Sequence, residues 1–379
     1  MLELPYGRVP YPLDLGGRAA SVIEAVRRPA PPPVEDLLVA ALRSPIDRPQ
    51  LRDLVGPGAR VTVIVSDATR VEPRGQFLAT LRTELPHARW TVAVATGTHG
   101  PANLDALDLP PDLGDVINHD GHATRDLVSL GTTARGTPVR VHRCVVETDL
   151  VIATGCIKPH YFAGFGAGCK AIFPGLGEAT AIRINHRLKT ADGARAGIVD
   201  GNPCREDLEE AVALVPTPVF LVNGVLAPDG LVHAVVAGDP RAAFRRGCDL
   251  ARSWFTVRAP KASLVIASDA LPVTASLYQA AKIASACAPL VADGGDLVLV
   301  AECAEGTGPL DTVNEAIFRI GVLPRLPTNA KIHLVSALPR EVVERTVVRP
   351  LTTLTPLLER ADSIVVVPRA SQLILETDS

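Results

Sequence analysis

The clearest pattern along the chain is a short Val/Ile-rich run followed by a turn that is loaded with polar residues. Within each run consecutive positions are apolar, and segments long enough to form a helix separate the runs. This arrangement predicts parallel strands that are buried on both faces, in α/β layers. The predicted strands span residues 60–67, 90–95, 148–154, 218–222, 262–268, 296–301, 331–336 and 362–367.

Four intervening segments are predicted helices, at residues 75–85, 206–214, 240–252 and 276–288. A chain of 379 residues exceeds what one hydrophobic core usually serves, so two domains are expected. A new strand follows the helix that ends near residue 252, and this places the boundary within residues 255–261. We therefore predict an N-terminal α/β domain over residues 1–257 and a C-terminal α/β domain over residues 258–379, whose last strand is a candidate to pack back on the first. The Pro-rich run RPAPPP at Arg28–Pro33 indicates a surface polyproline segment or linker.

Composition and charge exclude several classes of protein. Apolar residues make up 47% of the chain and charged residues 21%, as in ordinary globular proteins. The net charge of −3 gives no electrostatic reason to expect nucleic acid or an anionic membrane as partner. No apolar run reaches the roughly 18 residues of a membrane span, and the first residues lack the pattern of a signal peptide. Seven cysteines without CxxC spacing favour a reducing compartment, so we expect a cytoplasmic protein.

The distinctive polar residues follow predicted strands, at the carboxyl ends where α/β sheets bind ligands. Asp67-Ala68-Thr69-Arg70 follows the first strand, where Arg70 could bind a carboxylate or phosphate, although this turn could also simply cap a helix. Thr98 and His99 follow the second strand in ATGTH. The histidine could act as acid or base near neutral pH, or have a structural role.

The segment Lys158–Lys170 (KPHYFAGFGAGCK) has the highest density of candidate chemistry. Lys158, His160 and Lys170 flank three glycines that lie within five residues. Such glycines allow close backbone approach to a phosphate or a flat ring. The segment matches neither the P-loop nor the GxGxxG pattern. A glycine-rich packing turn is the alternative interpretation.

Two further clusters lie outside this segment. His186, in RINH, could ligate a metal or cap a helix, and the absence of HxxxH or HExxH spacing gives no support for zinc hydrolase chemistry. In Tyr278–Lys282 (YQAAK), Gln279 and Lys282 share one face of a predicted helix, which either presents two donors or is solvated. The INHD sequence at Ile117–Asp120 is typical of a turn.

Taken in this order, the clusters resemble the LarA lactate racemase family, the nickel-pincer nucleotide enzymes. Each motif is weak alone, and the specificity lies in their shared order from Leu4 to Gly306. The motifs are LPYG, DATR, ATGTH, INHD, PHYFAGFGAGCK, PGLG, INH, GNP, AGDP, YQAAK, DGG and AECAEG.

The resemblance implies an isomerase, a racemase or epimerase that inverts C2 of a small 2-hydroxy acid by hydride transfer. It implies cofactor binding and catalysis by the N-terminal domain, with the active site in the interdomain cleft. The implied cofactor is the nickel-pincer nucleotide, pyridinium-3-thioamide-5-thiocarboxylic acid mononucleotide, which holds nickel by carbon and two sulfurs and is attached to a lysine as a thioamide. The enzymes that make this cofactor are possible partners.

The family's functional residues carry over motif by motif. Lys170 matches the lysine that tethers the cofactor, and His186 matches the protein ligand to nickel. His99 and His160 match the two acid/base histidines. Residues near the substrate are Arg70, Tyr278, Gln279 and Lys282. The other predicted cofactor-binding residues are Asp67, Thr69, Thr98, Lys158, Gly166 and Gly168.

The chemistry of a hydroxy acid is consistent with these roles. The C2 hydrogen is poorly acidic beside a carboxylate, whereas its removal as hydride, while a base takes the hydroxyl proton, avoids a dianion. Inversion then needs a base on each side, and imidazoles suit both directions. A cationic pair such as Arg70 and Lys282 can hold the carboxylate. Imidazole is also a suitable nickel ligand beside soft sulfur donors.

The sequence departs from the family pattern at two places. The glycine-rich loop is FGAGCK where the family more often has FSGGxK, which changes the contacts that Gly166 and Ala167 offer. Residues 269–274 (DALPVT) replace the usual GGYPxD, so substrate contacts are expected to differ. We interpret Cys169 as a small buried filler, because the cofactor brings its own sulfurs.

Two other functions are alternatives to the racemase. A non-catalytic cofactor- or nucleotide-binding carrier of the same fold would need neither His99 nor His160. An NAD-dependent dehydrogenase is disfavoured by the missing dinucleotide fingerprint. The sequence does not name the hydroxy acid.

Overall fold

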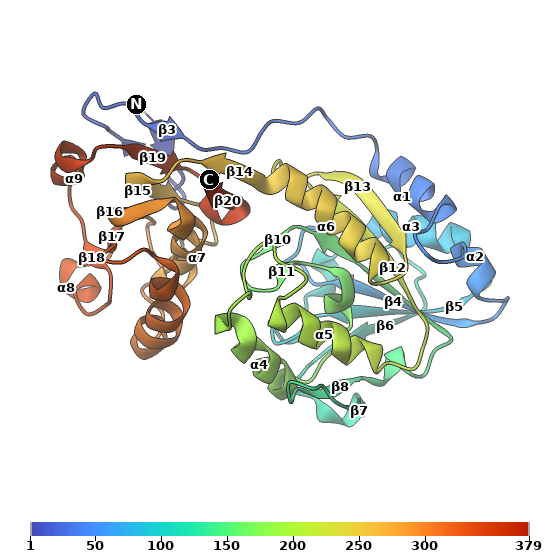
Figure 1. The fold of residues 1–379 in the computed structure, drawn as a ribbon. Helices are drawn as coiled ribbons and strands as arrows, with labels where there is room; N and C mark the ends of the chain where they lie inside the picture. Colours follow the sequence, from blue (N-terminus) through green and yellow to red (C-terminus); the bar gives the residue numbers. More distant parts are fainter. Residues whose placement is uncertain (1, 378–379) are drawn as a thin grey trace. The chain divides into compact units, whose positions relative to one another are not determined.

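The computed structural model describes residues 2–377, which form two compact units (Figure 1). Unit 1 consists of residues 2–26 and 255–377, and unit 2 is Arg27–Trp254. Each unit has a six-stranded sheet and a hydrophobic core of its own. The expected α/β class with mainly parallel sheets is therefore confirmed.

The sheet of unit 2 has the strand order β13-β12-β9-β4-β5-β6. All neighbours are parallel except β13, which pairs antiparallel with β12. The Val/Ile runs that predicted buried strands are buried along β4 and β9, as expected for a sheet covered on both faces. The strands of this unit are β4 (Arg60–Ser66), β5 (Arg89–Ala95), β6 (Asp115–Asn118), β7 (Leu127–Thr132), β8 (Pro138–His142), β9 (Leu150–Ile157), β10 (Pro159–His160), β11 (Gly164–Phe165), β12 (Val219–Leu226) and β13 (Val232–Gly238).

Helices cover the sheet of unit 2 through their apolar side chains. Leu38 of α1 and Phe77 of α3 are fully buried in one core with Val63 and Val92 of the sheet. A short 3₁₀ helix, η4 (Gly168–Ala171), follows β11. The α-helices of unit 2 are α1 (Val34–Arg43), α2 (Leu51–Leu54), α3 (Arg74–Glu84), α4 (Ala179–Arg187), α5 (Pro203–Ala213) and α6 (Ala242–Phe255).

The sheet of unit 1 has the order β18-β17-β16-β15-β19-β3, and every neighbouring pair is parallel. Two small ladders accompany it, β1 with β2 and β14 with β20. The strands are β1 (Leu2–Leu4), β2 (Tyr11–Leu13), β3 (Ser21–Val22), β14 (Thr256–Ala259), β15 (Ala262–Ser268), β16 (Val291–Val300), β17 (Lys331–Val335), β18 (Arg349–Pro350), β19 (Ile364–Val367) and β20 (Ile374–Thr377).

Helix α7 and the π-helix η7 (Thr312–Val322) pack into one core of unit 1. Leu277 and Ile283 of α7 and Phe318 of η7 are fully buried there. The α-helices of this unit are α7 (Leu277–Cys287), α8 (Arg340–Val343) and α9 (Thr355–Arg360). Across residues 2–377, no helix combines the length and apolar character needed to cross a bilayer.

The division of the chain differs from the predicted domains of residues 1–257 and 258–379. The break falls between Trp254 and Phe255, close to the predicted boundary, but residues 2–26 belong to unit 1. They do so because β3 pairs with β19 and because Leu4 and Leu13 are buried beside Leu264. The Pro-rich run lies just after this N-terminal segment, where the chain enters unit 2.

The last predicted strand, at residues 362–367, corresponds to β19 (Ile364–Val367), and it pairs with β3, whose residues lie within the predicted N-terminal domain. A further strand, β20, pairs with β14 inside unit 1. One local expectation differs from the structure. Residues Ile117 and Asn118, expected in a turn, belong to the edge strand β6. This strand is only four residues long and half-exposed, so it lacks the apolar run that marks the central strands.

The placement of the N-terminal hairpin in unit 1 leads to a stability prediction. Leu13 is 1% exposed in this core, so Leu13→Ala should lower the free energy of unfolding by about 2–5 kcal/mol. Val9 is 72% exposed, and Val9→Ala should change it by less than about 0.5 kcal/mol. Urea unfolding followed by far-ultraviolet circular dichroism measures both. Equal effects of the two substitutions would contradict the assignment of the hairpin to this core.

Candidate active site

The carboxyl ends of three neighbouring strands bring together most of the predicted site residues of unit 2. Strand β4 lies between β9 and β5, and all three run parallel. Asp67 and Arg70 follow β4, His99 follows β5, and His160 follows β9. Polar groups at this edge can therefore act on a single ligand, as in other open α/β sheets.

Asp67 and His99 form a hydrogen-bonded pair across two of these strand ends. The Nδ1 atom of His99 lies 2.7 Å from Oδ2 of Asp67, and the other carboxylate oxygen accepts from the backbone N–H of Thr69 at 2.9 Å. Burial opposes the charge of Asp67, but the bonds from His99 and Thr69 outweigh it and lower the pKa of Asp67 to about 2. An ionised carboxylate only accepts, so Nδ1 of His99 carries the proton and, in the neutral ring, Nε2 keeps a lone pair.

The turn that carries Asp67 and Arg70 is held by a buried ion pair. The guanidinium of Arg74, at the start of α3, donates to the carbonyls of Ser66 at 2.6 Å and of Arg70 at 2.8 Å, and also to that of Asp67. The carboxylate of Glu72 lies 3.7 Å from Arg74 and accepts from the backbone of Ser66. The buried charge of Arg74 is thus matched by a carboxylate while its donors fix the turn.

The ring of Phe162 lies beside three of the predicted site residues, His160, Lys170 and His186. Its ring meets the ring of His160 edge-on at 4.6 Å and that of His186 at 5.1 Å. The Nζ atom of Lys170 lies 5.7 Å from the centre of the same ring. Phe162 is 4% exposed, so the predicted acid/base, tethering and metal-binding side chains gather around one buried aromatic ring.

The amine of Lys170 is in an environment that disfavours its charge. Burial, followed by the positive charges of Arg205 and Arg70, lowers the pKa of Lys170 to about 7. A large fraction of this amine is therefore neutral and nucleophilic at neutral pH. Burial, together with the charges of Lys170, Arg70 and Arg205, also holds the pKa of His160 well below its ordinary value.

Hydrogen bonds set the proton positions of His160 and His186 in opposite ways. The Nδ1 atom of His160 accepts from the backbone N–H of Ala163 at 3.2 Å, so the neutral ring carries its proton on Nε2. The Nδ1 atom of His186 lies 2.7 Å from the carbonyl of Ile182, which can only accept. His186 therefore carries its proton on Nδ1 and has a free lone pair on Nε2.

His186 consequently has the form that a metal ligand requires. Burial and then the charge of Lys170 lower the pKa of His186 to about 4, so the imidazole is neutral at neutral pH. A bond from the other ring nitrogen to a carbonyl is the usual way in which a protein orients such a ligand. Within residues 2–377, no three His, Cys, Asp or Glu side chains gather to form a metal site. A metal at His186 would need further donors from a bound group.

Comparisons with known proteins agree with this arrangement. Residues 6–197, which are 192 of the 379 residues, match the lactate racemase N-terminal domain. The chain belongs to the lactate racemase family. The lactate racemase of Thermoanaerobacterium thermosaccharolyticum is 29% identical, over 96% of this chain and 95% of that protein. The lactate racemase of Lactiplantibacillus plantarum is 30% identical, over 72% of this chain and 67% of that protein.

Solved structures support the same assignment. The lactate racemase apoprotein from Thermoanaerobacterium thermosaccharolyticum superposes with a TM-score of 0.84 at 26% identity, covering 98% of this chain and 99% of that chain. A protein from Thermotoga maritima has a TM-score of 0.65 at 14% identity, covering 93% of this chain and 100% of that one, which shows a shared fold alone. The chain is accordingly an isomerase of the racemase type.

Apart from Arg70, the residues predicted to lie near the substrate of this racemase are in α7 of unit 1. The Nζ atom of Lys282 donates to Oε1 of Gln279 at 2.6 Å, so these two side chains do share a helix face. Ser276 caps the helix by accepting from the backbone N–H of Gln279 at 3.4 Å. Tyr278 packs partly buried against the core of unit 1. Their role toward the groups of unit 2 stays a prediction.

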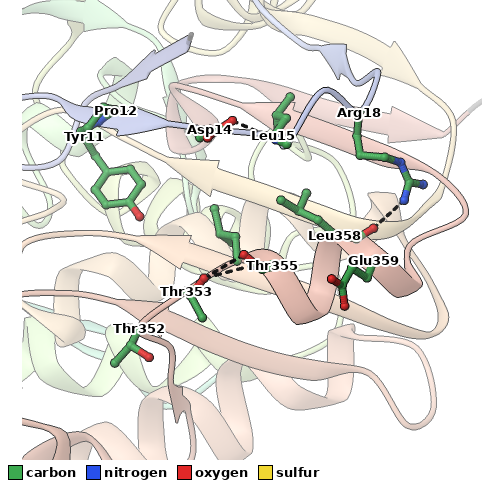
Figure 2. A pocket seen from close by; sticks show the side chains of 12 residues that line it. Tyr11, Pro12, Asp14, Leu15, Arg18, Thr352, Thr353, Thr355, Leu358 and Glu359 are labelled. Carbon is green, nitrogen blue, oxygen red and sulfur yellow. Dashed lines mark hydrogen bonds between the residues drawn. The ribbon is translucent and has the colours of Figure 1, made fainter.

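A pocket in unit 1 contains none of the predicted site residues of the racemase (Figure 2). It has a volume of about 410 Å³ and lies between residues 11–18 and 352–359. Arg18 lines the pocket and donates to the carbonyl of Leu358 at 2.7 Å, which ties the N-terminal segment to α9.

Sequence reasoning missed three side chains that shape the site of the racemase. Phe162 was part of a recognised motif, but an aromatic residue next to a glycine-rich loop gives no sign of what it contacts. Nothing in the sequence distinguishes Arg74 and Arg205 from surface arginines, although they are 7% and 0% exposed. Their burial depends on chain segments that are distant in sequence. Cys169 is 8% exposed, and burial raises the pKa of its thiol to about 12, which agrees with its interpretation as a filler.

The departure from the family pattern at Ala167 has a structural consequence in this racemase. Ala167 adopts φ 59° and ψ −153°, a region that only glycine occupies without strain. The next residue, Gly168, has φ +65°, and a Cβ there would lie 2.5 Å from the ring of Phe244. The backbone at Ala167 thus keeps a conformation suited to the glycine that the family more often has there.

We therefore predict that Ala167→Gly raises the free energy of unfolding by about 1 kcal/mol, because relief of strain exceeds the added freedom of the unfolded chain. Ala171 is buried in η4, and Ala171→Gly should lower it by a similar amount. Thermal unfolding of both variants beside the parent chain measures the difference. A loss of stability in both variants would contradict the strain at position 167.

Proposed function

We propose that this racemase inverts C2 of a 2-hydroxy acid by moving the C2 hydrogen as hydride, with a nickel-pincer nucleotide held at Lys170 and His186. The observation that carries the proposal is the set of contacts around Phe162, which gather the Lys170 amine, His160 and His186 at one ring. The relatives that are named lactate racemase support the reaction class and a hydroxy acid substrate.

The side chains present fit such a cofactor. The neutral amine of Lys170 is suited to covalent attachment, and the Nε2 lone pair of His186 is suited to a single metal bond. Residues 167 and 168 both have positive φ, and a Cβ at Gly168 would meet the ring of Phe244, so the loop has no room for a larger side chain there. When bound, the cofactor supplies a hydride acceptor and the remaining donors to nickel.

The two catalytic histidines handle the hydroxyl proton. His99 presents a lone pair at Nε2, and the carboxylate of Asp67 stabilises the imidazolium that forms when it accepts a proton. His160 presents an N–H at Nε2 in its neutral form. To deliver a proton as an imidazolium, it must gain one at Nδ1 and give up the bond from Ala163. Proton removal by His99 thus needs only its Nε2 lone pair, whereas proton delivery from Nε2 of His160 needs a second proton taken up at Nδ1 beforehand.

Cationic and polar groups would hold the substrate carboxylate. Arg70 is exposed at the carboxyl end of β4, and its guanidinium donates to Oγ1 of Thr69 at 2.9 Å, which restricts its orientation. An arginine at such a turn can bind a carboxylate through two parallel hydrogen bonds. Gln279 and Lys282 are the proposed partners from unit 1, and Thr69, Thr98, Asp67 and Lys158 are proposed to complete the surroundings of the cofactor.

Substitution of Lys170 and of His186 should distinguish covalent attachment of the cofactor from binding of nickel. In protein co-expressed with the cofactor-making enzymes, Lys170→Ala should lose the covalent adduct, whereas His186→Ala should keep it and lose nickel. Intact-mass measurement and nickel analysis give the two readouts. Lys261→Ala, at an exposed lysine of unit 1, is the matched control and should retain both. An unmodified Lys170 in a fully active, nickel-loaded enzyme would contradict the tether.

Removal of either acid/base histidine should stop racemisation without unfolding the chain. His99→Ala and His160→Ala should each lower kcat by about 10²–10⁴-fold in both directions, because inversion needs both groups. His87→Ala, at an exposed histidine, is the control and should leave kcat unchanged. The assay follows a panel of 2-hydroxy acid stereoisomers carrying deuterium at C2, which should be retained in the product. Full activity in either variant would remove the two-histidine scheme, and loaded protein that converts no substrate would favour a carrier.

A further inference from the structure

Helix α4, which carries His186, is held near its end by a buried hydrogen-bond network that the proposed function does not use. Asn185, the residue before His186, is 1% exposed. Its amide nitrogen donates to Oδ2 of Asp207 at 2.8 Å and to the carbonyl of Cys204 at 3.3 Å. Its amide oxygen accepts from the thiol of Cys204 at 3.3 Å. Both polar atoms of the Asn185 side chain are therefore engaged with residues of α5.

Asp207 is the centre of this network. It is 0% exposed, and its carboxylate also accepts from Oγ1 of Thr133 at 2.5 Å and from Oγ1 of Thr137 at 2.7 Å. Both threonines are buried in the turn between β7 and β8. The two oxygens of one carboxylate can accept several hydrogen bonds, so a single side chain can hold donors from different elements. Asp207 thus joins α4 and the β7–β8 hairpin to α5 within unit 2 (Figure 1).

The hydrogen bond that orients the ring of His186 is internal to α4. The Nδ1 atom of His186 lies 2.7 Å from the carbonyl of Ile182, one turn earlier in the same helix. This bond fixes the ring relative to α4, but it does not fix the rotation of α4 within unit 2. Consecutive residues of an α-helix point about 100° apart, so a contact that fixes the direction of Asn185 also fixes that of His186.

We propose that Asp207 is a positioning residue of this active site, which fixes the rotation of α4 through Asn185 and so directs Nε2 of His186 toward the bound metal. The proposal deepens the proposed function, since it rests on His186 as the protein ligand to nickel. Groups that hold a metal ligand in its direction affect metal affinity without touching the metal. At the other end of α4, Glu178 pairs with Arg140 at 2.8 Å, but Glu178 lies about two turns before His186.

A second carboxylate of α5 provides a matched comparison. Glu210 accepts from the backbone N–H of Ala134 at 2.7 Å, in the same turn between β7 and β8. This bond joins the hairpin to α5, as two of the bonds of Asp207 do, whereas the third bond of Asp207 reaches Asn185 in α4. Substitution of Glu210 therefore controls for a weakened contact between the hairpin and α5.

Four variants separate the bond to α4 from general packing. Asp207→Ala and Asn185→Ala each remove one side of the bond between α5 and α4. Asp207→Asn is the conservative variant, because its amide oxygen can still accept from Asn185 while the threonine hydroxyls, which donate or accept, turn to its other atoms. Glu210→Ala is the control. Should Asp207→Ala fail to fold by circular dichroism, Asp207→Ser takes its place.

The experiment uses the full chain, loaded by co-expression with the cofactor-making enzymes, and follows the loss of nickel to excess EDTA. Nickel is expressed per covalent adduct at Lys170, which intact mass counts. Asp207→Ala and Asn185→Ala should each lose nickel about 10-fold faster than the parent chain, because the ligand is less well directed. Asp207→Asn and Glu210→Ala should keep the parent rate. The double Ala variant should be no faster than either single variant, since both act through one bond.

Nickel loss at the parent rate in the folded Ala variants of Asp207 and Asn185 would overturn the proposal. Multiplied effects in the double variant, or an equal acceleration in Glu210→Ala, would overturn it as well. A merely structural network would lower the free energy of unfolding without changing nickel loss at a temperature where all variants are folded. Retention of nickel by His186→Ala would instead contradict the proposed function. Nickel loss in His186→Ala, with parent rates in the other variants, would remove the positioning role alone.

Discussion

Buried backbone outside regular structure has to satisfy its carbonyl groups, and the site depends on how this chain meets that constraint. The two segments that carry the proposed catalytic groups follow parallel strands, and other parts of the chain cover them. Arg74 binds the carbonyls of the turn after β4, and Arg205 binds those of the loop around β11. Each arginine stands in the first turn of a helix, α3 or α5. The helices therefore contribute to the site through the side chains at their starts, and the turns hold their polar groups in fixed positions.

The same contacts determine the charge of the site. Arg74 is matched by Glu72, so the turn after β4 adds little net charge, and Asp67 is engaged with His99. Arg70 and Arg205 both lower the pKa of Lys170. Such an excess of positive charge favours an anionic ligand, and it adds to the burial that lowers the pKa of Lys170, His160 and His186. A cofactor with a phosphate and a substrate with a carboxylate both meet this requirement.

Much of the fold could be predicted because buried parallel strands leave continuous apolar runs, as at β4 and β9. The order of polar motifs after these runs likewise predicted which residues gather in unit 2. Long-range pairings could not be predicted in the same way. The strand β3 is two residues long and both residues are exposed, so nothing in its sequence indicates that it joins β19. The burial of Arg205 was equally hidden, since the segments that cover it lie some forty residues earlier, at Ala163 and Phe165.

The three histidines show most clearly what the structure adds to the motif. In the sequence His99, His160 and His186 are the same side chain, and the resemblance alone distinguishes their roles. Their partners differ in kind: a carboxylate for His99, a backbone N–H for His160 and a carbonyl for His186. When the partner of Nδ1 is an acceptor, Nδ1 carries the proton and Nε2 of the neutral ring has the lone pair. When the partner of Nδ1 is a donor, Nε2 carries the proton. These partners thus suit the three rings to the roles proposed for them, His99 as a base, His160 as a hydrogen-bond donor and His186 as a metal ligand, and the loop that Arg205 holds supplies the N–H that distinguishes His160.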